Sequence, residues 1–337
     1  MCRLNEILRY FSPEIRKLLE MSIGGYADNI QEIRLRCGKP VAVSSYGKVR
    51  YISGGQPAYK VSRNDIEYTF QALCNYSVHS YQNEIAQSFI TVKGGHRAGI
   101  AGSAVLNDNH ITSVKYISSI NFRIASQIKG CSDRIYSQIF SQRPEGLLVA
   151  GVPSSGKTTF LRDLCRNLSE KYCVSVIDER GEIGAVYHGE PQNDLGMMCD
   201  VFDGYPKAEG LQTALRVMSP DIAVCDEIGG ESEVRQLLSC VNAGVKIIAS
   251  AHAGSVDELY RRKNIKILLE NGVFDYIVML GKKENTGRAE KIVRVSDYDY
   301  KAHRHNNDND MLSACGYCDV VKAVRACENS RTADKSC

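Results

Sequence analysis

Hydrophobic and polar positions divide the chain into regions, of which the first covers residues 1–125. Here apolar and polar residues alternate in short segments separated by glycine and proline turns, which is typical of antiparallel strands. Two helical stretches stand among them, one starting at Ser12-Pro13 and one at Ser62. We expect a small α+β domain whose strands lie near 32–36, 41–45, 49–53, 89–93, 96–105 and 116–125.

From residue 147 onward the apolar positions form continuous runs instead of alternating with polar ones. A turn containing Gly, Asp or His follows each run, and a helical stretch follows most of them, which predicts a parallel sheet with crossover helices. We expect this second domain to cover residues 147–300, after a linker and short helix over 126–146 that begins at Ser132-Asp133. The runs cover 147–151, 174–178, 222–226, 246–251 and 276–280.

The composition is that of a globular protein. Of the 337 residues, 43% are hydrophobic and 24% charged, which excludes a wholly disordered or fibrous chain. A formal net charge of +3 is too balanced to favour nucleic acid or a membrane surface over the whole chain. The 13 cysteines show no disulfide framework, which indicates a reducing cytoplasm. No segment has the apolar length of a leader or a membrane span, so we expect membrane contact only through partners.

The last stretch, residues 301–337, is polar and irregular, and we expect it to be a weakly ordered tail. It contains a Cys-x-x-Cys pair at Cys315 and Cys318, but a second pair with zinc-ribbon spacing is missing. An unstructured reduced tail and a structural zinc site both stay open at this point.

A phosphate-binding motif lies at residues 151–158, whose sequence GVPSSGKT matches G-x-x-x-x-G-K-[ST] between an apolar run and a helical stretch. Gly151 and Gly156 allow the backbone to turn its N–H groups toward phosphates. Lys157 is expected to reach the β- and γ-phosphates and Thr158 to bind Mg²⁺. A glycine-rich turn that merely caps a helix is the alternative. The expected ATP-binding residues here are Gly151, Val152, Pro153, Ser154, Ser155, Gly156, Lys157, Thr158 and Thr159.

A second motif ends the apolar run 222–226, where Asp226 and Glu227 stand together. At the carboxyl end of a buried strand, Asp226 is placed to hold the Mg²⁺ water shell and Glu227 to orient or deprotonate the attacking water. The run 174–178 leaves room for an extra strand between the two motifs, as in NTPases that use a catalytic glutamate. Two solvated acids at a strand end are the alternative. Together the motifs predict an α/β fold, a RecA-like P-loop NTPase core with a parallel sheet, preceded by the smaller α+β N-terminal domain.

Two further polar clusters follow other apolar runs, and parallel strands bring their carboxyl ends to one edge of a sheet. One has the sequence DERGE and contains Glu179 and Glu182; the other has the sequence AHAG and contains His252. We expect these three side chains near the γ-phosphate, with a solvated turn and a core or capping histidine as the alternatives. Arg216, in the helix before the acidic motif, is a candidate for neutralising transition-state charge, or else an ordinary surface charge.

The order of the motifs, with DERGEIG, ALRVMSPDIAVCDEIGG and ASAHAGSVDEL following the phosphate loop, resembles the secretion ATPases of type II and type IV systems. Among these, the chain is most similar to the stage III sporulation protein AA family of endospore-forming bacteria. The resemblance covers roughly residues 31–296 and includes EIRLRCGKPVAV, GGHRAGIAGSAV and SSINFRIA. It implies a cytoplasmic, ring-forming, hexameric ATPase that serves membrane proteins of a channel between mother cell and forespore.

The resemblance also implies roles for individual residues. In such proteins an acidic box, here DERGE at 178–182, and a histidine box, here AHAG at 251–254, line the nucleotide site. Arginines of the N-terminal domain reach the phosphates, and the matching positions here are Arg97 and Arg123. One departure is Cys-Asp-Glu at 225–227, where many type II members have Gly-Glu, so the division of labour between Asp226 and Glu227 can differ. No nucleic acid is expected as a partner. A nucleotide-gated scaffold with little turnover and a nucleic-acid-stimulated motor stay open as alternatives.

Overall fold

The computed structural model describes residues 3–23, 30–45, 47–52, 54, 58–108, 110–282 and 285–298. The expected tail at 301–337, with its Cys-x-x-Cys pair, lies outside the described residues. The chain up to Tyr298 forms one compact unit that contains two β-sheets, so the division into domains at 125 and 147 stays a prediction. None of the helices in the described segments combines the length and the apolar character that crossing a bilayer requires.

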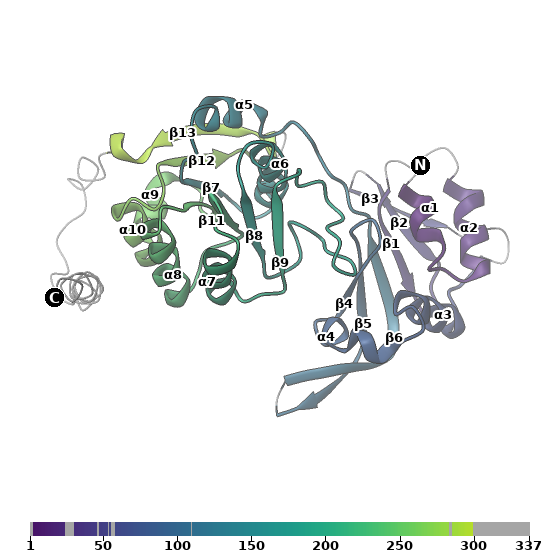
Figure 1. The fold of residues 1–337 in the computed structure, drawn as a ribbon. Helices are drawn as coiled ribbons and strands as arrows, with labels where there is room; N and C mark the ends of the chain where they lie inside the picture. The colour runs from purple at the N-terminus through teal and green to yellow at the C-terminus, as the bar shows by residue number, and fades with distance from the viewer. Residues whose placement is uncertain are drawn as a thin grey trace, which may run out of the picture. The chain divides into compact units, whose positions relative to one another are not determined.

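The first sheet has six antiparallel strands in the order β3-β2-β1-β6-β5-β4 (Figure 1). The predicted strand pattern is confirmed: β1, β2 and β3 form one meander, β4, β5 and β6 form another, and β1 pairs with β6 to join them. The β5–β6 hairpin is longer than expected because the ladder continues through residues 106–115. The strands are β1 (Ile30–Arg36), β2 (Val41–Ser45), β3 (Lys48–Ile52), β4 (Phe89–Val92), β5 (His96–Asn107) and β6 (His110–Arg123).

Helices pack on this sheet and close its hydrophobic core. Ser62 begins α3 as the sequence predicts: its hydroxyl accepts a hydrogen bond from the Asp65 N–H at 3.1 Å, and the Asp65 carboxylate accepts one from the Ser62 N–H at 2.8 Å. Phe11 packs on Phe122 of β6 with ring centroids 4.6 Å apart, and both rings are fully buried. The helices are α1 (Arg3–Leu8), α2 (Pro13–Ile23), α3 (Arg63–Leu73) and α4 (Gln82–Ala86).

The second sheet has seven strands in the order β13-β12-β7-β11-β10-β8-β9, and all neighbouring pairs are parallel except β12 with β13. The five predicted strands are confirmed. The edge strands β9 and β13 were not predicted because neither has a continuous apolar run. The strands are β7 (Leu147–Gly151), β8 (Val174–Asp178), β9 (Cys199–Asp203), β10 (Ile222–Cys225), β11 (Lys246–His252), β12 (Tyr276–Leu280) and β13 (Ala289–Arg294).

The lateral order of these strands corrects one sequence prediction. The strand that lies between β7, which precedes the phosphate loop, and β10, which precedes the acidic motif, is β11 and not the run 174–178. That run forms β8, on the far side of β10. Strand order along the chain does not report strand order in a sheet. As a consequence, His252 at the end of β11 stands between the ends of β7 and β10.

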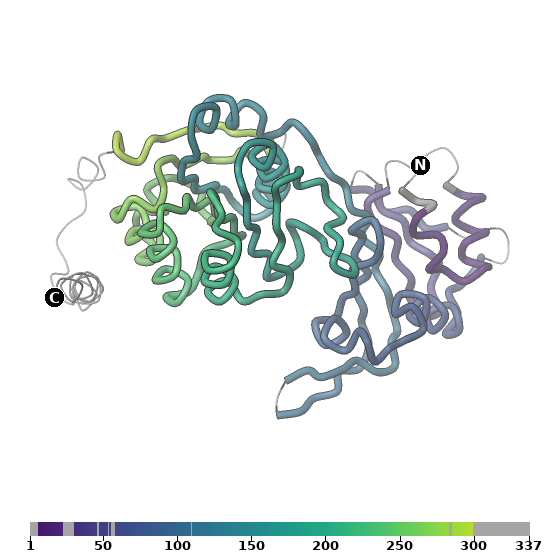
Figure 2. Tube along the Cα trace, viewed as in Figure 1, coloured from purple at the N-terminus to yellow at the C-terminus, as the bar shows by residue number. Residues whose placement is uncertain are grey.

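Helices cover both faces of the second sheet (Figure 1). Phe160 and Leu164 of α6 pack with Val149 of β7 in the core under one face, while α7, α8, α9 and α10 gather on the other. Between β8 and β9 the chain makes a long excursion over residues 179–198 before it returns to the sheet (Figure 2). The helices are α5 (Asp133–Ile135), α6 (Lys157–Leu168), α7 (Lys207–Val217), α8 (Glu231–Asn242), α9 (Val256–Arg261) and α10 (Lys263–Glu270).

The predicted linker is tied to α6 by Asp163, a buried residue of that helix. Its carboxylate accepts hydrogen bonds from the Gly130 N–H at 3.0 Å, the Ser132 N–H at 2.8 Å and the Ser132 hydroxyl at 2.7 Å, and it pairs with Arg166 at 2.9 Å. Ser132 precedes α5 at the predicted helix start, but its side chain binds Asp163 and does not cap the helix. Burial raises the pKa of Asp163, but these donors outweigh burial and hold the pKa below its usual value.

Replacing Asp163 by alanine is expected to lower the free energy of unfolding by about 3 kcal/mol, because buried donors lose their acceptor. In the wild type this stabilisation is present above the unfolded-state pKa and is lost as the pH falls through the folded-state pKa. Urea unfolding measures both effects. Asp133→Ala is the control, since that side chain is 63% exposed and its loss should change stability by about 0.5 kcal/mol or less. Equal losses in the two variants would contradict the role assigned to Asp163.

Candidate nucleotide-binding site

The loop between β7 and α6 requires glycine at both fixed glycine positions. Gly156 has a φ of +87°, and a Cβ there would lie 3.0 Å from the main chain of Gly287. A Cβ on Gly151 would overlap the Ser155 hydroxyl. That hydroxyl is buried, and it has no hydrogen-bond partner in the part of the chain that the structure describes. A glycine-bounded turn at a helix start with an orphaned hydroxyl fits a group that brings acceptor oxygens, such as phosphate.

Lys157, the first residue of α6, is buried and turned back onto its own loop. Its ammonium donates to the main-chain oxygens of residues 151 and 152 at 3.1 Å each and lies 2.9 Å from Nδ1 of His252. Burial lowers the pKa of Lys157, and the carboxylates of Glu227 and Asp226 oppose that effect. The loop therefore holds a desolvated cation whose direct partners are neutral, which favours the binding of an anionic group beside it.

Thr158 and Asp226 come together as the two motifs predict. The Thr158 hydroxyl donates to Oδ2 of Asp226 at 3.2 Å, and the Ser250 hydroxyl donates to Oδ1 of the same carboxylate at 2.6 Å. Within the described residues, no group of three or more His, Cys, Asp or Glu side chains is arranged to hold a metal. One hydroxyl and one carboxylate suit Mg²⁺, which keeps several waters and takes other ligands from phosphates. These oxygens thus fit the expected Mg²⁺.

His252 connects the phosphate loop to the acidic motif. Because its Nδ1 accepts from Lys157, we assign the ring proton to Nε2, which lies 3.2 Å from Oε1 of Glu227. Arg180 reaches the other carboxylate oxygen of Glu227 at 3.8 Å. The geometry depends on β11 lying between β7 and β10, since His252 ends that strand. The structure thus brings together three of the predicted catalytic side chains, Lys157, His252 and Glu227.

The first acid of the DERGE box has a structural part in the site. Asp178, at the end of β8, is buried, and its carboxylate accepts the N–H groups of residues 182, 183 and 184 at 2.8, 2.9 and 2.7 Å. Burial raises the pKa of Asp178, the three N–H donors lower it, and the nearby Asp226 raises it further, so that its pKa lies above the usual value. Asp178 therefore shapes the loop that carries Glu179 and Glu182.

The two predicted glutamates of this loop point to different partners. Glu179 pairs with Lys207 at 3.4 Å and Glu182 pairs with Arg97 at 3.2 Å. Their side chains are 41% and 39% exposed. In the part of the chain that the structure describes, the two glutamates thus pair with different cations and do not form a single acidic cluster at the phosphate loop. Whether Glu179 and Glu182 take part in chemistry stays a prediction.

The predicted arginines lie in three different settings. Arg97 of β5 pairs with Glu182, donates to the main-chain oxygen of Arg180 and covers the ring of Phe89 with its guanidinium 4.4 Å from the centroid. Its ladder partner Arg123 lies 3.5 Å from Glu32 and is 68% exposed. Arg216 is exposed in the last turn of α7, the end of that helix from which the chain enters β10. The structure therefore does not bring Arg216 to the other site residues.

Two functional candidates were missed by the sequence reading. Ser250 holds Asp226, and Lys207 contacts both Glu179 and the main chain of Glu227. Ser250 stands two positions before His252. Because side chains two apart in a strand lie on the same face, the sequence could have predicted that Ser250 faces the site. Lys207 had no signal beyond being a charge at a helix start, because its contacts depend on how α7 packs against the sheet.

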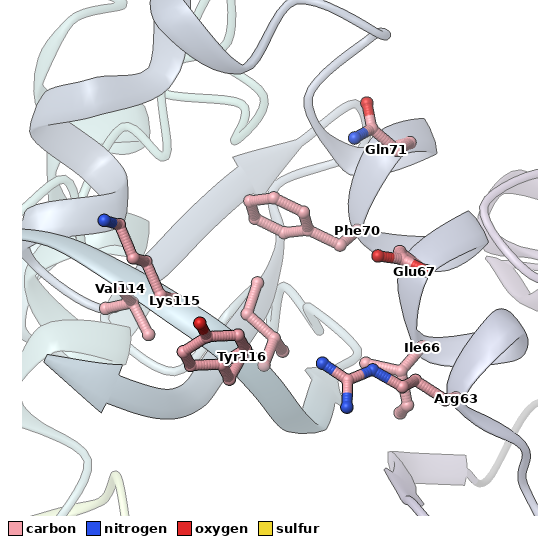
Figure 3. Close-up of a pocket in the computed structure, with 9 residues that line it drawn as sticks. Arg63, Ile66, Glu67, Phe70, Gln71, Val114, Lys115 and Tyr116 are labelled. Atoms are coloured by element: carbon pink, nitrogen blue, oxygen red, sulfur yellow. The ribbon is translucent and has the colours of Figure 1, made fainter.

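A cavity of about 350 Å³ lies apart from this site, between α3 and β6 of the first sheet. Figure 3 shows Arg63, Glu67 and Phe70 of α3 on one side and Tyr116 of β6 on the other. All of its lining residues fall between positions 63 and 117, so no predicted site residue contributes to it. The cavity therefore does not belong to the phosphate-loop site.

Comparison with known sequences identifies relatives over nearly the full described chain. The family described as "Sporulation stage III, protein AA" matches residues 1–301. Stage III sporulation protein AA of Bacillus subtilis (strain 168) is 34% identical over 295 residues, which cover 86% of this chain and 94% of the relative. The expected family resemblance is confirmed.

Solved structures support the fold. The Legionella pneumophila ATPase DotB has a TM-score of 0.50 and 18% identity over 79% of this chain and 75% of its own. The pilus retraction motor PilT, solved with bound ADP, has a TM-score of 0.53 and 15% identity over 79% of this chain and 76% of its own. These similarities confirm the expected α/β fold with its N-terminal sheet.

Proposed function

The chain belongs to the sporulation stage III, protein AA family, and from this membership we propose that it hydrolyses ATP as a motor of a sporulation complex. The observation that supports the proposal is a connected series of side-chain contacts at the edge of the second sheet where its parallel strands have their carboxyl ends. Lys157 of the phosphate loop lies 2.9 Å from His252, which lies 3.2 Å from Glu227, and Thr158 lies 3.2 Å from Asp226. This set combines a phosphate cradle, a cation, a Mg²⁺ position and a general base.

In this function each residue has a separate task. Main-chain N–H groups of the phosphate loop, other than that of Pro153, which has none, bind the phosphates, and Lys157 turns from its own loop to their oxygens. Glu227 accepts a proton from water as the water oxygen attacks the γ-phosphorus; the bond from that phosphorus to its bridging oxygen breaks, and ADP leaves with the electron pair. His252 donates to Glu227 and keeps its carboxylate in place. Thr158 and Asp226 would hold Mg²⁺, which would supply positive charge to the phosphates when bound.

We further propose that the protein forms a ring, expected to be a hexamer, in the cytoplasm. Because Arg216 is exposed at the end of α7 away from the site, any contact it makes with a nucleotide would be with that of a neighbouring subunit. Arg97 and Arg123 would reach phosphates only by leaving their glutamate partners. Contact with the membrane would run through membrane proteins of the sporulation channel.

Phosphate release by the purified full chain with ATP and Mg²⁺ tests the proposed function. We expect turnover that stops when the metal is chelated, and an increase in particle mass on addition of ATP. ATP that stays bound without turnover would replace this function by the nucleotide-gated scaffold. Stimulation by DNA or RNA that weakens steeply with salt would replace it by the nucleic-acid motor.

Replacing Ser250 by alanine is expected to raise the Mg²⁺ concentration for half-maximal activity by at least about tenfold, because Asp226 loses the hydroxyl that orients it. A titration of ATPase activity with Mg²⁺ measures the shift. Ser175→Ala is the matched control: Ser175 is buried in the nearby strand β8, and its hydroxyl has no partner among the described residues. A shift of the same size in both variants would contradict the role of Ser250.

A further inference from the structure

Lys207 is a buried cation beside the candidate site that the proposed mechanism does not use. Its ammonium donates to the main-chain oxygen of Glu227 at 2.6 Å and lies 3.4 Å from a carboxylate oxygen of Glu179 and 3.9 Å from one of Glu233. Only 8% of its side chain is exposed. A buried ammonium is costly unless it is paired and hydrogen-bonded, and here oxygens of three residues satisfy it.

The packing of α7 explains how Lys207 reaches this place. Gly210 lies three residues after Lys207 and on the same helix face. A Cβ at Gly210 would lie 2.7 Å from Cγ2 of Ile177 in β8, so a larger residue would push the helix away from the sheet. Glycine within a helix costs about 1 kcal/mol relative to alanine. The close approach that it permits puts the first residue of α7 beside the acids that follow β8 and β10.

Lys207 supports Glu227 differently from His252 and Arg180, which contact its carboxylate. His252 and Arg180 lie 3.2 and 3.8 Å from the Glu227 carboxylate, and their side chains are 34% and 65% exposed. Lys207 instead binds the main chain of Glu227 at 2.6 Å and is buried. The main-chain oxygen of Glu227 is therefore held by a desolvated cation, and the same cation pairs with Glu179 of the DERGE box.

We propose that Lys207 is a positioning residue for ATP hydrolysis. It fixes the main-chain oxygen of Glu227, so that the Glu227 carboxylate is directed at the attacking water. Through its ion pair with Glu179, it also holds the loop of the DERGE box next to Glu227. This inference rests on the proposed function. Because Lys207 contacts neither the phosphate loop nor the Mg²⁺ oxygens of Thr158 and Asp226, its removal should act on turnover and not on ATP binding.

The test is the steady-state kinetics of Lys207→Met in the full chain with ATP and Mg²⁺. We expect kcat to fall by about 10²-fold with KM for ATP little changed, since a small displacement of a catalytic group has that effect. Lys207→Arg should restore part of kcat, because the guanidinium keeps the charge and the donors. In a Glu227→Gln background, Lys207→Met should cause little further loss, because both changes act on one group.

Lys246→Met is the matched control. Lys246 also lies near two carboxylates, at 2.8 Å from Asp275 and 3.9 Å from Glu145, but at the start of β11, the opposite end from His252. We expect its loss to lower stability and leave kcat unchanged. Three outcomes would overturn this inference and leave the proposed function standing. They are a wild-type kcat in Lys207→Met, an equal loss of kcat in both variants, and a loss of ATP affinity without a loss of kcat. A wild type that does not hydrolyse ATP would overturn the proposed function and this inference with it.

Discussion

Replacing Lys157 by alanine is expected to reduce kcat/KM for ATP hydrolysis by at least about 10³-fold. Lys157 is the first residue of α6 and places a cation beside the phosphates. Alanine has no charge to neutralise the negative charge that develops on the transferring phosphoryl group. Phosphate release and nucleotide titration measure the loss in turnover and in affinity. The variant should remain folded, because burial lowers the pKa of Lys157 and so disfavours the ammonium in the native state.

Lys171→Ala is the control for this prediction. Lys171 also donates to two main-chain oxygens, those of Ser141 at 2.9 Å and Gln142 at 3.3 Å, but it follows the far end of α6. Its loss should leave hydrolysis unchanged. Full activity in Lys157→Ala would show that the glycine-bounded loop does not bind the transferred phosphate, and the proposed function would have no support from the site.

Replacing Glu227 by glutamine is expected to lower kcat by about 10³-fold while ATP stays bound. Glutamine keeps the size of the side chain and an oxygen that can accept from Nε2 of His252, but it cannot take a proton from water. Single-turnover hydrolysis of ATP, together with the amount of ATP retained on the protein, separates the two effects.

Glu231→Gln is the control, because Glu231 is an exposed acid in the first turn of α8, four residues after Glu227. It should hydrolyse ATP like the wild type. If Glu227→Gln still hydrolysed ATP at the wild-type rate, another acid would be the general base. Asp226 would be the first candidate, because the Cys-Asp-Glu sequence at 225–227 departs from the pattern of the resemblance.

The phosphate loop and the acidic motif could be predicted because their information is local. Gly156 needs its positive φ whatever surrounds it, and Lys157 and Thr158 follow it directly at the start of a helix. The buried strands were also predictable, since runs such as 147–151 and 174–178 are mainly apolar, as is typical of strands that are buried on both faces. The edge strand β13 was not, because alternation in a short polar segment is a weak signal.

The sequence by itself determined which side chains stand at the ends of the parallel strands, and hence that Lys157, Asp226, Glu227 and His252 are available to one edge. Only the tertiary structure decided which of them touch. The contacts of Lys157 with His252 and of Arg97 with Glu182 join residues 95 and 85 positions apart. Such pairs depend on the lateral order of strands and on the packing of α7 against β8. Strand order and helix packing follow from how the apolar faces of distant segments are buried together. The spacing of residues within one segment holds no information on this.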